Sequence, residues 1–154
     1  MGIFKEDLLN LGNLIDTEVE VKLGGREFGE VYPGLGFVFE NGLLRIRGSR
    51  KVLFFRRPFE LRAREDPGNV YTVKDHETKD FGIRLLIVSR EGIDEVLKRD
   101  GFRLEGEHLC VSLFPVFRRT DIYRDIPDTF RDRIKITRYR IRDGYLSVFL
   151  TVTK

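Results

Sequence analysis

The two-residue loop Asp143-Gly144, close to the C-terminus, constrains the fold of this chain more than any other feature. Such a loop favours positive φ at its two residues, and its twist matches that of antiparallel strands, so it predicts a β-hairpin over residues 134–152. Side chains alternate between the faces of a strand, and the loop fixes which residues share a face. The expected core face carries Tyr139, Ile141, Leu146, Val148 and Leu150. The expected opposite face is basic and aromatic, with Arg138, Arg140, Arg142, Tyr145 and Phe149.

A second hairpin, over residues 37–47, is predicted by the loop Asn41-Gly42. In both hairpins an apolar residue two positions before the loop faces a leucine two positions after it, and arginines occupy the reverse side. This similarity leaves open an internal duplication and convergent patterning. One face of the second hairpin is expected to carry Phe37, Phe39, Leu44 and Ile46, and the other Val38, Glu40, Leu43, Arg45 and Arg47.

Alternating apolar residues and turn signals predict the remaining strands. We expect strands over residues 17–23, 70–73, 81–88, 102–104 and 108–114, separated in part by turns at 66–69 and 105–107. The strand at 81–88 is apolar on both faces near its end, which favours a central position. Residues 51–64 are rich in strand-forming residues, and Pro58 requires either a bend or a sheet edge there. Residues 28–36 contain three glycines and Pro33, which predict a loop.

Helices are expected to be few and short. Helical spacing of apolar residues predicts a helix over 3–15, and Ser89 is a suitable N-cap for a helix over about 90–99. Pro127 predicts the start of a short helical turn. Tight turns dominate, and no strand-helix-strand period repeats. The predicted fold class is therefore α+β, a strongly twisted, mainly antiparallel sheet built from hairpins and packed against one main helix, about 90–99, and a short N-terminal helix.

Length and composition fit a single globular domain over residues 1–154. No apolar run approaches the roughly 18 residues of a membrane-spanning helix. Glutamine is absent, Cys and Met occur once each, and arginine dominates the positive charge, as in many proteins from hot environments. A lone Cys110 excludes an internal disulfide. No signal-peptide pattern opens the sequence, so we expect a cytoplasmic location unless a leader has been removed.

Positive charge is concentrated in two blocks of the chain. Residues 41–64 carry eight basic side chains against Glu60 alone, and residues 116–154 carry ten basic against five acidic. The segments 1–40 and 65–115 are net acidic, and the whole chain has a net charge of +3. Both basic blocks coincide with predicted hairpins, which suggests either a surface for an anionic partner or internal pairing with the acidic segments.

No group of residues predicts catalysis, and we expect neither an enzyme nor a metal or cofactor. His76 and His108 lack partners at metal-ligand spacing. P-loop, nucleophile-elbow and dinucleotide-binding motifs are absent from the sequence. Four carboxylates recur at helical spacing, but Pro127 interrupts the helix and nearby arginines favour surface ion pairs. These carboxylates are Asp121, Asp125, Asp128 and Asp132.

Three segments, taken in order, carry a resemblance to a known family. They are the strand start at 19–21, the strand that runs into a helix at 88–97, and Ile126-Pro127 followed by the hairpin with its Asp-Gly loop. In this order the chain resembles bacterial tubular lipid-binding proteins, the group that includes the LmeA-like phospholipid-binding family. The resemblance implies a curved sheet wrapped around a helix that holds acyl chains, and it implies export, whereas the sequence pattern leads us to expect no leader.

Two functional hypotheses follow. The first is a non-catalytic binding module for a lipid or other amphipathic anionic ligand, in which arginines at the mouth of an apolar groove bind the phosphate. The second is a basic sheet face that docks nucleic acid or an acidic protein. Self-association through an edge near Pro58 is the remaining alternative, and the oligomeric state is open. The groove residues would be Phe37, Phe39, Val96, Leu97, Tyr139 and Ile141. The predicted ligand-binding residues are Arg45, Arg47, Arg138, Arg140, Arg142, Tyr145 and Phe149.

Overall fold

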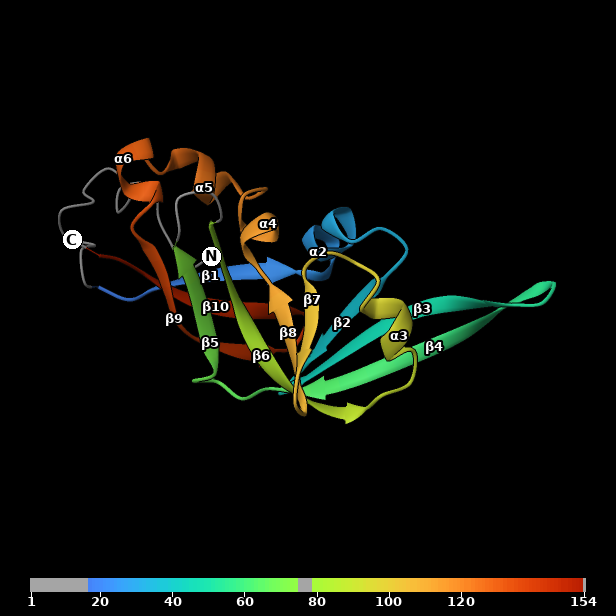
Figure 1. The fold of residues 1–154 in the computed structure, drawn as a ribbon. Coiled ribbons are helices and arrows are strands. Elements are labelled where there is room, and N and C mark those ends of the chain that lie inside the picture. Colours follow the sequence, from blue (N-terminus) through green and yellow to red (C-terminus); the bar gives the residue numbers. More distant parts are fainter. Residues whose placement is uncertain (1–16, 75–78, 154) are drawn as a thin grey trace.

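The computed structural model describes residues 17–74 and 79–153, which form two antiparallel sheets (Figure 1). The smaller sheet has the order β1-β10-β9 and contains the C-terminal hairpin. Its strands are β1 (Val19–Gly24), β9 (Ile134–Arg142) and β10 (Tyr145–Val152). The hairpin register is confirmed, since Ile141 lies opposite Leu146 and Arg138 opposite Phe149. Beyond that pair a bulge shifts the register, so that Leu150 lies opposite Ile136.

The larger sheet has the order β2-β3-β4-β6-β8-β7, with β5 also paired to β6. Its strands are β2 (Gly36–Glu40), β3 (Leu43–Val52), β4 (Phe55–Arg64), β5 (Val70–Lys74), β6 (Lys79–Ser89), β7 (Phe102–Glu105) and β8 (His108–Ser112). The predicted hairpin at Asn41-Gly42 is confirmed, and β6 is central, as its apolar pattern predicts. Pro58 lies at a sheet edge, because β4 pairs with β6 only through residues 62–64.

The helices are short and few among the described residues. They are α2 (Gly25–Val31), α3 (Ile93–Val96), α4 (Phe114–Phe117), α5 (Asp121–Asp125) and α6 (Asp128–Arg131). Figure 1 shows α4, α5 and α6 following one another along one side of the two sheets. The α+β class and the mainly antiparallel sheet are thus confirmed. The predicted helix over 3–15 and the loop with His76 lie outside the described residues.

The main helix predicted over 90–99 is wrong, because α3 spans only Ile93–Val96. Ser89 is not its N-cap but the last residue of β6, where it pairs with Arg62 of β4. The helix begins instead after Gly92, whose left-handed φ of 74° reverses the chain. Sheet pairing takes the residue predicted as the N-cap, and the residues of 90–99 outside α3 lie in turns or irregular structure, so that a single helical turn remains.

The loop predicted over 28–36 is also wrong in its first part, because α2 runs through Gly25–Val31. The Gly24 amide donates to Glu27 Oε2 at 3.0 Å, which caps the first turn. Phe28 is fully buried, with its ring centroid 5.1 Å from that of Phe37 and 5.3 Å from that of Phe39. Packing of one aromatic side chain therefore stabilises a helix that its glycines disfavour.

The two predicted hairpins pack into one core and join through their loops. The Gly42 amide donates to Ile141 O at 2.9 Å, and the Gly144 amide donates to Phe39 O at 2.8 Å. Asp143 Oδ1 accepts from the Asn41 amide at 2.9 Å. In each loop only the glycine has positive φ, which corrects the expectation for both loop residues. Each loop is therefore a connection between the sheets as well as a turn.

Removing the Asp143 carboxylate tests this connection. We expect Asp143→Ala to lower the free energy of unfolding by about 1 kcal/mol, because the Asn41 amide loses its acceptor while the loop glycine remains. Asp143→Asn keeps a side-chain oxygen and is the matched control, with a smaller expected effect. Urea denaturation followed by circular dichroism measures both. Equal effects of the two variants would show that the hydrogen bond contributes nothing.

Candidate functional site

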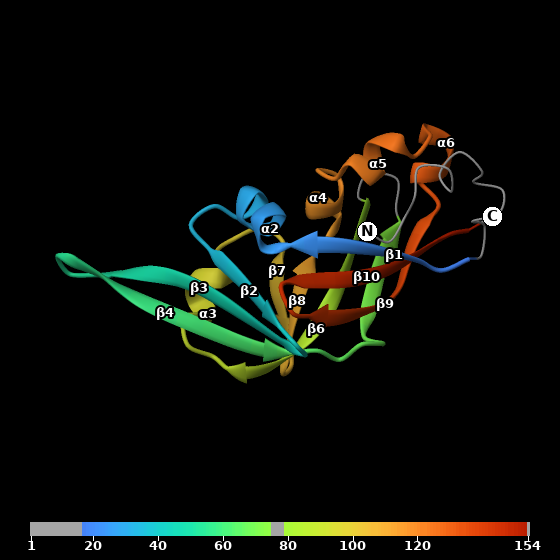
Figure 2. The same cartoon turned by 180° about the vertical axis from the view of Figure 1, so that it is seen from behind.

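A two-stranded ribbon projects from the larger sheet as an arm, formed by residues 48–59 (Figures 1 and 2). In the ladder, Arg50 lies opposite Arg57, Lys51 opposite Arg56, and Val52 opposite Phe55. The neighbouring strands stop short, since β2 pairs with β3 only up to Arg47 and β6 reaches β4 only at 62–64. Within the described chain, the arm is therefore a ribbon with two open edges.

Like charges face each other across this ribbon. The directly opposed pairs are Arg50 with Arg57 and Lys51 with Arg56 in the arm, and Arg45 with Arg62 next to its root. Opposed like charges destabilise an antiparallel pair, so these positions do not serve the stability of the hairpin. Half of the basic block at 41–64 thus lies on the projecting arm, and the other half lies on the same two strands next to its root.

Several of these cations lack a carboxylate partner among residues 17–74 and 79–153. Arg45 pairs with Glu40 at 3.1 Å, Arg47 with Glu60 at 2.8 Å, and Arg50 with Asp94. The other five make no ion pair in this part of the chain, and one of them donates to the Ser49 hydroxyl at 2.8 Å instead. These unpaired cations are Lys51, Arg56, Arg57, Arg62 and Arg64.

The tip of the arm is apolar and open to solvent. Leu53, Phe54 and Phe55 are 78, 101 and 59% exposed, and they follow Val52 without a polar residue between them. Leu53 has φ of 53° and is the only non-glycine residue with positive φ among the described residues. A two-residue hairpin loop ordinarily places Gly, Asn or Asp there. The sequence here keeps two large apolar side chains at a cost in backbone strain.

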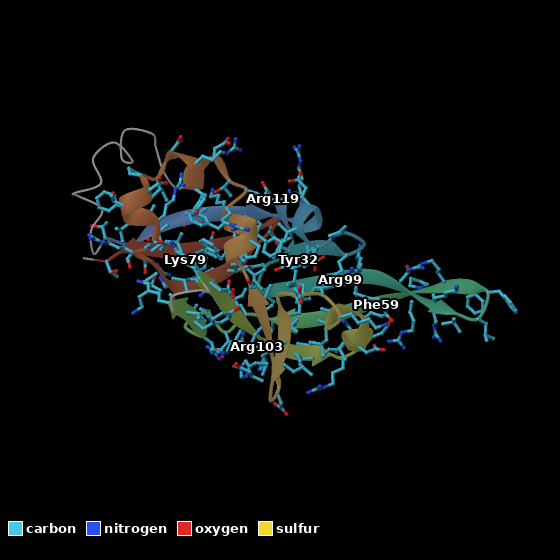
Figure 3. The ribbon with its side chains drawn as sticks, turned by 45° about the horizontal axis from the view of Figure 1, so that its top comes forward. Tyr32, Phe59, Lys79, Arg99, Arg103 and Arg119 are labelled. Carbon is cyan, nitrogen blue, oxygen red and sulfur yellow. The ribbon has the colours of Figure 1, made fainter. Side chains whose placement is uncertain are left out.

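A hollow of about 440 Å³ lies at the root of the arm. Phe59, labelled in Figure 3, forms part of its wall, and the loop before α3 closes the other side. The charged residues that line it are Arg50, Arg57, Arg90, Glu91 and Asp94. Arg57 and Arg90 have no ion-pair partner in the described chain, whereas Asp94 binds Arg50. The Arg50 Nε atom is buried there without a hydrogen-bond partner in the same part of the structure.

The predicted ligand-binding residues of the C-terminal hairpin make contacts within the chain. Arg138 lies 3.8 Å above the Phe149 ring and pairs with Glu18 at 2.7 Å, and Phe149 is only 8% exposed. Hydrogen bonds from Arg138 hold the pKa of Glu18 below its usual value. Arg140 pairs with Glu65 at 3.4 Å. Phe149 is therefore covered, and Arg138 and Arg140 remain partly exposed but are each paired with a carboxylate of the same chain.

Tyr145 and Arg142 differ from their neighbours on that hairpin. The Lys22 ammonium lies 4.9 Å from the centre of the Tyr145 ring, and both residues are on the smaller sheet. Arg142 makes no ion pair with any described residue. Arg45 and Arg47 of the other hairpin are placed at the base of the arm, far along the chain from Arg142. Among the described residues, no hydrogen bond or ion pair joins the arginines of one predicted basic face to those of the other, and a ligand role for these faces stays a prediction.

The residues predicted to line an apolar groove belong to the packed core. Phe37, Phe39, Val96, Tyr139 and Ile141 are all buried, and Leu97 packs against them. The Tyr139 hydroxyl donates to Arg84 O at 2.6 Å and accepts from the Asp66 amide at 2.7 Å, so its polar end is satisfied. Neither the hollow at the arm nor the larger cleft on the body is lined by these six residues.

This larger cleft, of about 600 Å³, lies between β5, β7 and α4. Ser112 Oγ donates to Asp80 Oδ1 at 2.6 Å, and Tyr71 donates to Asp80 Oδ2 at 3.1 Å. Tyr32 donates to Ser112 O at 2.9 Å, and burial raises the pKa of both tyrosines. Lys79 and Arg103, labelled in Figure 3, stand at its edge. Each of these cations is already paired, with Asp132 and Glu105 respectively.

The sequence signal of the arm is an apolar run, which can indicate either a buried strand or an exposed tip. The run Val52-Leu53-Phe54-Phe55 is typical of a buried strand, and it predicts a core element when read alone. Its flanks differ from those of a core strand, since Arg50, Lys51, Arg56 and Arg57 enclose it on both sides. Symmetrical cationic flanks around four apolar residues were the sign of an exposed tip.

Groups of three or more potential metal ligands are absent from the described residues. Within the same ranges, no helix is long and apolar enough to cross a bilayer. Comparison with protein-family models, with curated proteins and with solved structures finds no match to this chain. The arm with its apolar tip, its unpaired cations and the hollow at its root is therefore assigned as the candidate site from its own geometry.

Proposed function

We propose that the protein is a non-catalytic module that binds the surface of an anionic membrane by inserting the tip of its arm. The observation that supports this most is the fully exposed Phe54, with Leu53 and Phe55 beside it and unpaired cations directly behind. An exposed apolar group rimmed by charges marks an interaction site on a protein surface. This proposal keeps the lipid hypothesis but places its site on the arm rather than in a groove.

The apolar tip of the arm suits the acyl-chain region of a membrane, and the cations behind the tip suit its anionic headgroups. Transfer of a large apolar side chain out of water contributes about 1.5–3 kcal/mol when burial is complete. A basic residue held near an anionic leaflet contributes about 1 kcal/mol. Lys51, Arg56 and Arg57 adjoin the tip and form no ion pair among the described residues. Both contributions therefore act in the same bound position.

The length of the ribbon sets the depth of insertion. A strand rises about 3.3 Å per residue, so the Arg57 position lies roughly 10 Å behind Phe54. Interfacial elements typically bury their apolar side about 5–10 Å into the boundary between headgroups and acyl chains. When Phe54 reaches that depth, Arg57 and the opposed Arg50 lie at the level of the phosphates. Basic side chains on both faces of the ribbon stop deeper entry.

Nucleic acid is the main competitor for a basic ribbon, and the tip favours lipid over it. Proteins that kink a duplex insert apolar wedges between base steps, and one such side chain fills one step. Here three neighbouring apolar side chains form a continuous group, of which a stacked step would cover only part. A membrane interface covers all of them at once.

The absence of tryptophan from the chain allows a direct test. In Phe54→Trp the indole is the only one in the protein, so its emission reports the surroundings of the tip. We expect a blue shift, and quenching by brominated acyl chains, with vesicles of phosphatidylcholine and phosphatidylserine but not with phosphatidylcholine alone. Val88→Trp places the same probe on the body, where Val88 is also exposed, and should show no shift.

Salt and competing DNA separate the alternatives. Binding to anionic vesicles should weaken as NaCl is raised but persist in part, because insertion of the tip does not depend on charge. Binding to duplex DNA would fall steeply with salt and leave the indole emission of Phe54→Trp unshifted. A tip that stays in water on every vesicle would overturn the proposal, and a concentration-dependent shift without lipid would identify self-association instead.

A further inference from the structure

The hollow at the root of the arm has no function in simple insertion of the tip. The hollow lies on the face of the ribbon that continues the core, because Arg57 shares one face of β4 with the buried Phe59 and Leu61. Along that face the sequence changes from buried apolar residues to the opposed pair Arg50 and Arg57, and then returns to the apolar pair Val52 and Phe55. Two guanidinium groups are thus placed between the core and the tip.

We propose that this hollow binds a phosphate monoester, and the proposal rests on the membrane function argued above for the arm. Arg50 and Arg57 enter it from the ribbon and Arg90 from the loop before α3. Arginine presents a planar fork of donors that suits phosphate oxygens. A bound anion also removes the repulsion between opposed arginines and supplies an acceptor for the buried Arg50 Nε.

The surrounding charges favour a monoester over a diester. Glu91 and Asp94 also line the hollow, and Asp94 already holds Arg50. A competing anion must therefore carry a large charge, and a phosphate monoester carries about −1.5 to −2 near pH 7. Its three terminal oxygens match three guanidinium groups, whereas a phosphodiester has a single charge and two free oxygens. Three arginines around one hollow are more than a diester requires.

The shape of the hollow depends on close packing between the loop and the ribbon. A Cβ atom on Gly92 would lie 2.0 Å from the Phe59 ring, and Gly92 has φ of 74°. The loop that carries Arg90 and Glu91 is therefore held against the arm by a position that only glycine occupies without strain. This contact fixes Arg90 beside the two arginines of the ribbon.

Adjacent arginines on the arm provide a matched pair of variants. Arg57 lines the hollow, and Arg56 points to the opposite face at almost the same distance from the tip. We expect the wild type to prefer vesicles with phosphatidic acid, a monoester, over vesicles of equal surface charge with phosphatidylglycerol, a diester. Arg57→Gln and Arg90→Gln should each reduce binding to phosphatidic acid about fivefold to tenfold and remove the preference. Arg56→Gln should weaken binding to both lipids by about the same factor.

Inorganic phosphate separates a lipid headgroup from a free ligand. If the headgroup is the source, millimolar inorganic phosphate competes with phosphatidic acid only weakly. Strong competition, together with a rise in melting temperature that Arg90→Gln abolishes, would assign the hollow to a soluble phosphate compound and keep the monoester chemistry. Equal behaviour of Arg56→Gln and Arg57→Gln on both lipids overturns the proposal.

The function of the tip is judged separately, by the indole emission of Phe54→Trp. When Arg57→Gln or Arg90→Gln is added to that variant, the emission should still shift on phosphatidylglycerol vesicles although the preference for phosphatidic acid is lost. A failure of the hollow is therefore distinguishable from a failure of the tip.

Discussion

Replacing Leu53 with Asn and Phe54 with Gly should weaken binding to anionic vesicles about a hundredfold and leave the fold intact. Asparagine tolerates the positive φ of 53° that Leu53 adopts at the first loop position, whereas in the Asn41-Gly42 loop the positive φ, of 80°, belongs to the second residue. The double variant removes the two most exposed apolar side chains and the positive φ of a leucine. The lost insertion corresponds to about 3 kcal/mol, or a hundredfold weaker binding, if each side chain contributes at the lower end of the range for complete burial.

The loss of binding in this variant should therefore not be accompanied by a loss of stability. We expect the free energy of unfolding to stay the same or rise by about 1 kcal/mol, because the loop now suits its conformation. Vesicle sedimentation and chemical denaturation measure the two quantities. Val88→Ser removes an exposed apolar side chain from the body and serves as the control, with unchanged binding. Undiminished sedimentation of the Asn-Gly variant would exclude the tip as the membrane contact.

Truncating Phe28 should have the largest effect on stability. Phe28→Ala is expected to lower the free energy of unfolding by about 3–5 kcal/mol, because a fully buried ring is lost from between α2 and β2. This is a large share of the roughly 5–15 kcal/mol that stabilises a typical domain. Guanidinium denaturation measures the change, and loss of helical signal near the midpoint should accompany it.

Two further variants show whether the loss of stability in Phe28→Ala arises from the packing of the ring. Phe28→Leu keeps an apolar side chain in the site and should cost clearly less than the alanine variant. Gly29→Ala lies on the same helix, where an added Cβ would contact nothing within 4 Å, so it should be neutral or slightly stabilising. A loss below about 1 kcal/mol for Phe28→Ala would mean that α2 is not anchored by this ring.

The hairpins could be predicted from sequence because their determinants are local. The loops at Asn41-Gly42 and Asp143-Gly144 fix the turn, and period-two alternation then fixes the buried face. Tyr139 and Leu146 are accordingly buried, as that alternation predicts. Local signals failed at α2 and α3, where the outcome depends on distant residues. Phe37 and Phe39 stabilise α2, and pairing with Arg62 draws Ser89, the predicted N-cap of the second helix, into β6.

Of the candidate site, the sequence predicted the concentration of positive charge but not the residues that form the site. The basic block at 41–64 does mark the functional element that we propose, but hairpin register points to Arg45 and Arg47 within that block and not to the residues of the arm. Arg45 and Arg47 have acidic partners close by, at Glu40 and Glu60. Arg138 is paired with Glu18, which is 120 positions away along the chain. Pairing at that separation depends on the folded sheet, and no pattern in the sequence reveals it.

The open edges of the arm determine how copies of the protein meet one another. A ribbon with unpaired amides and carbonyls on both sides can accept a further strand and so begin a chain of stacked molecules. Pro58 removes one amide donor from the outer edge, and the cations along the ribbon repel those of a second arm. We expect that repulsion to keep the molecules apart in water. An anionic bilayer would neutralise the charges of the arms and so remove this repulsion. Membrane-bound molecules would then be able to approach one another, with their arms parallel and at the same depth.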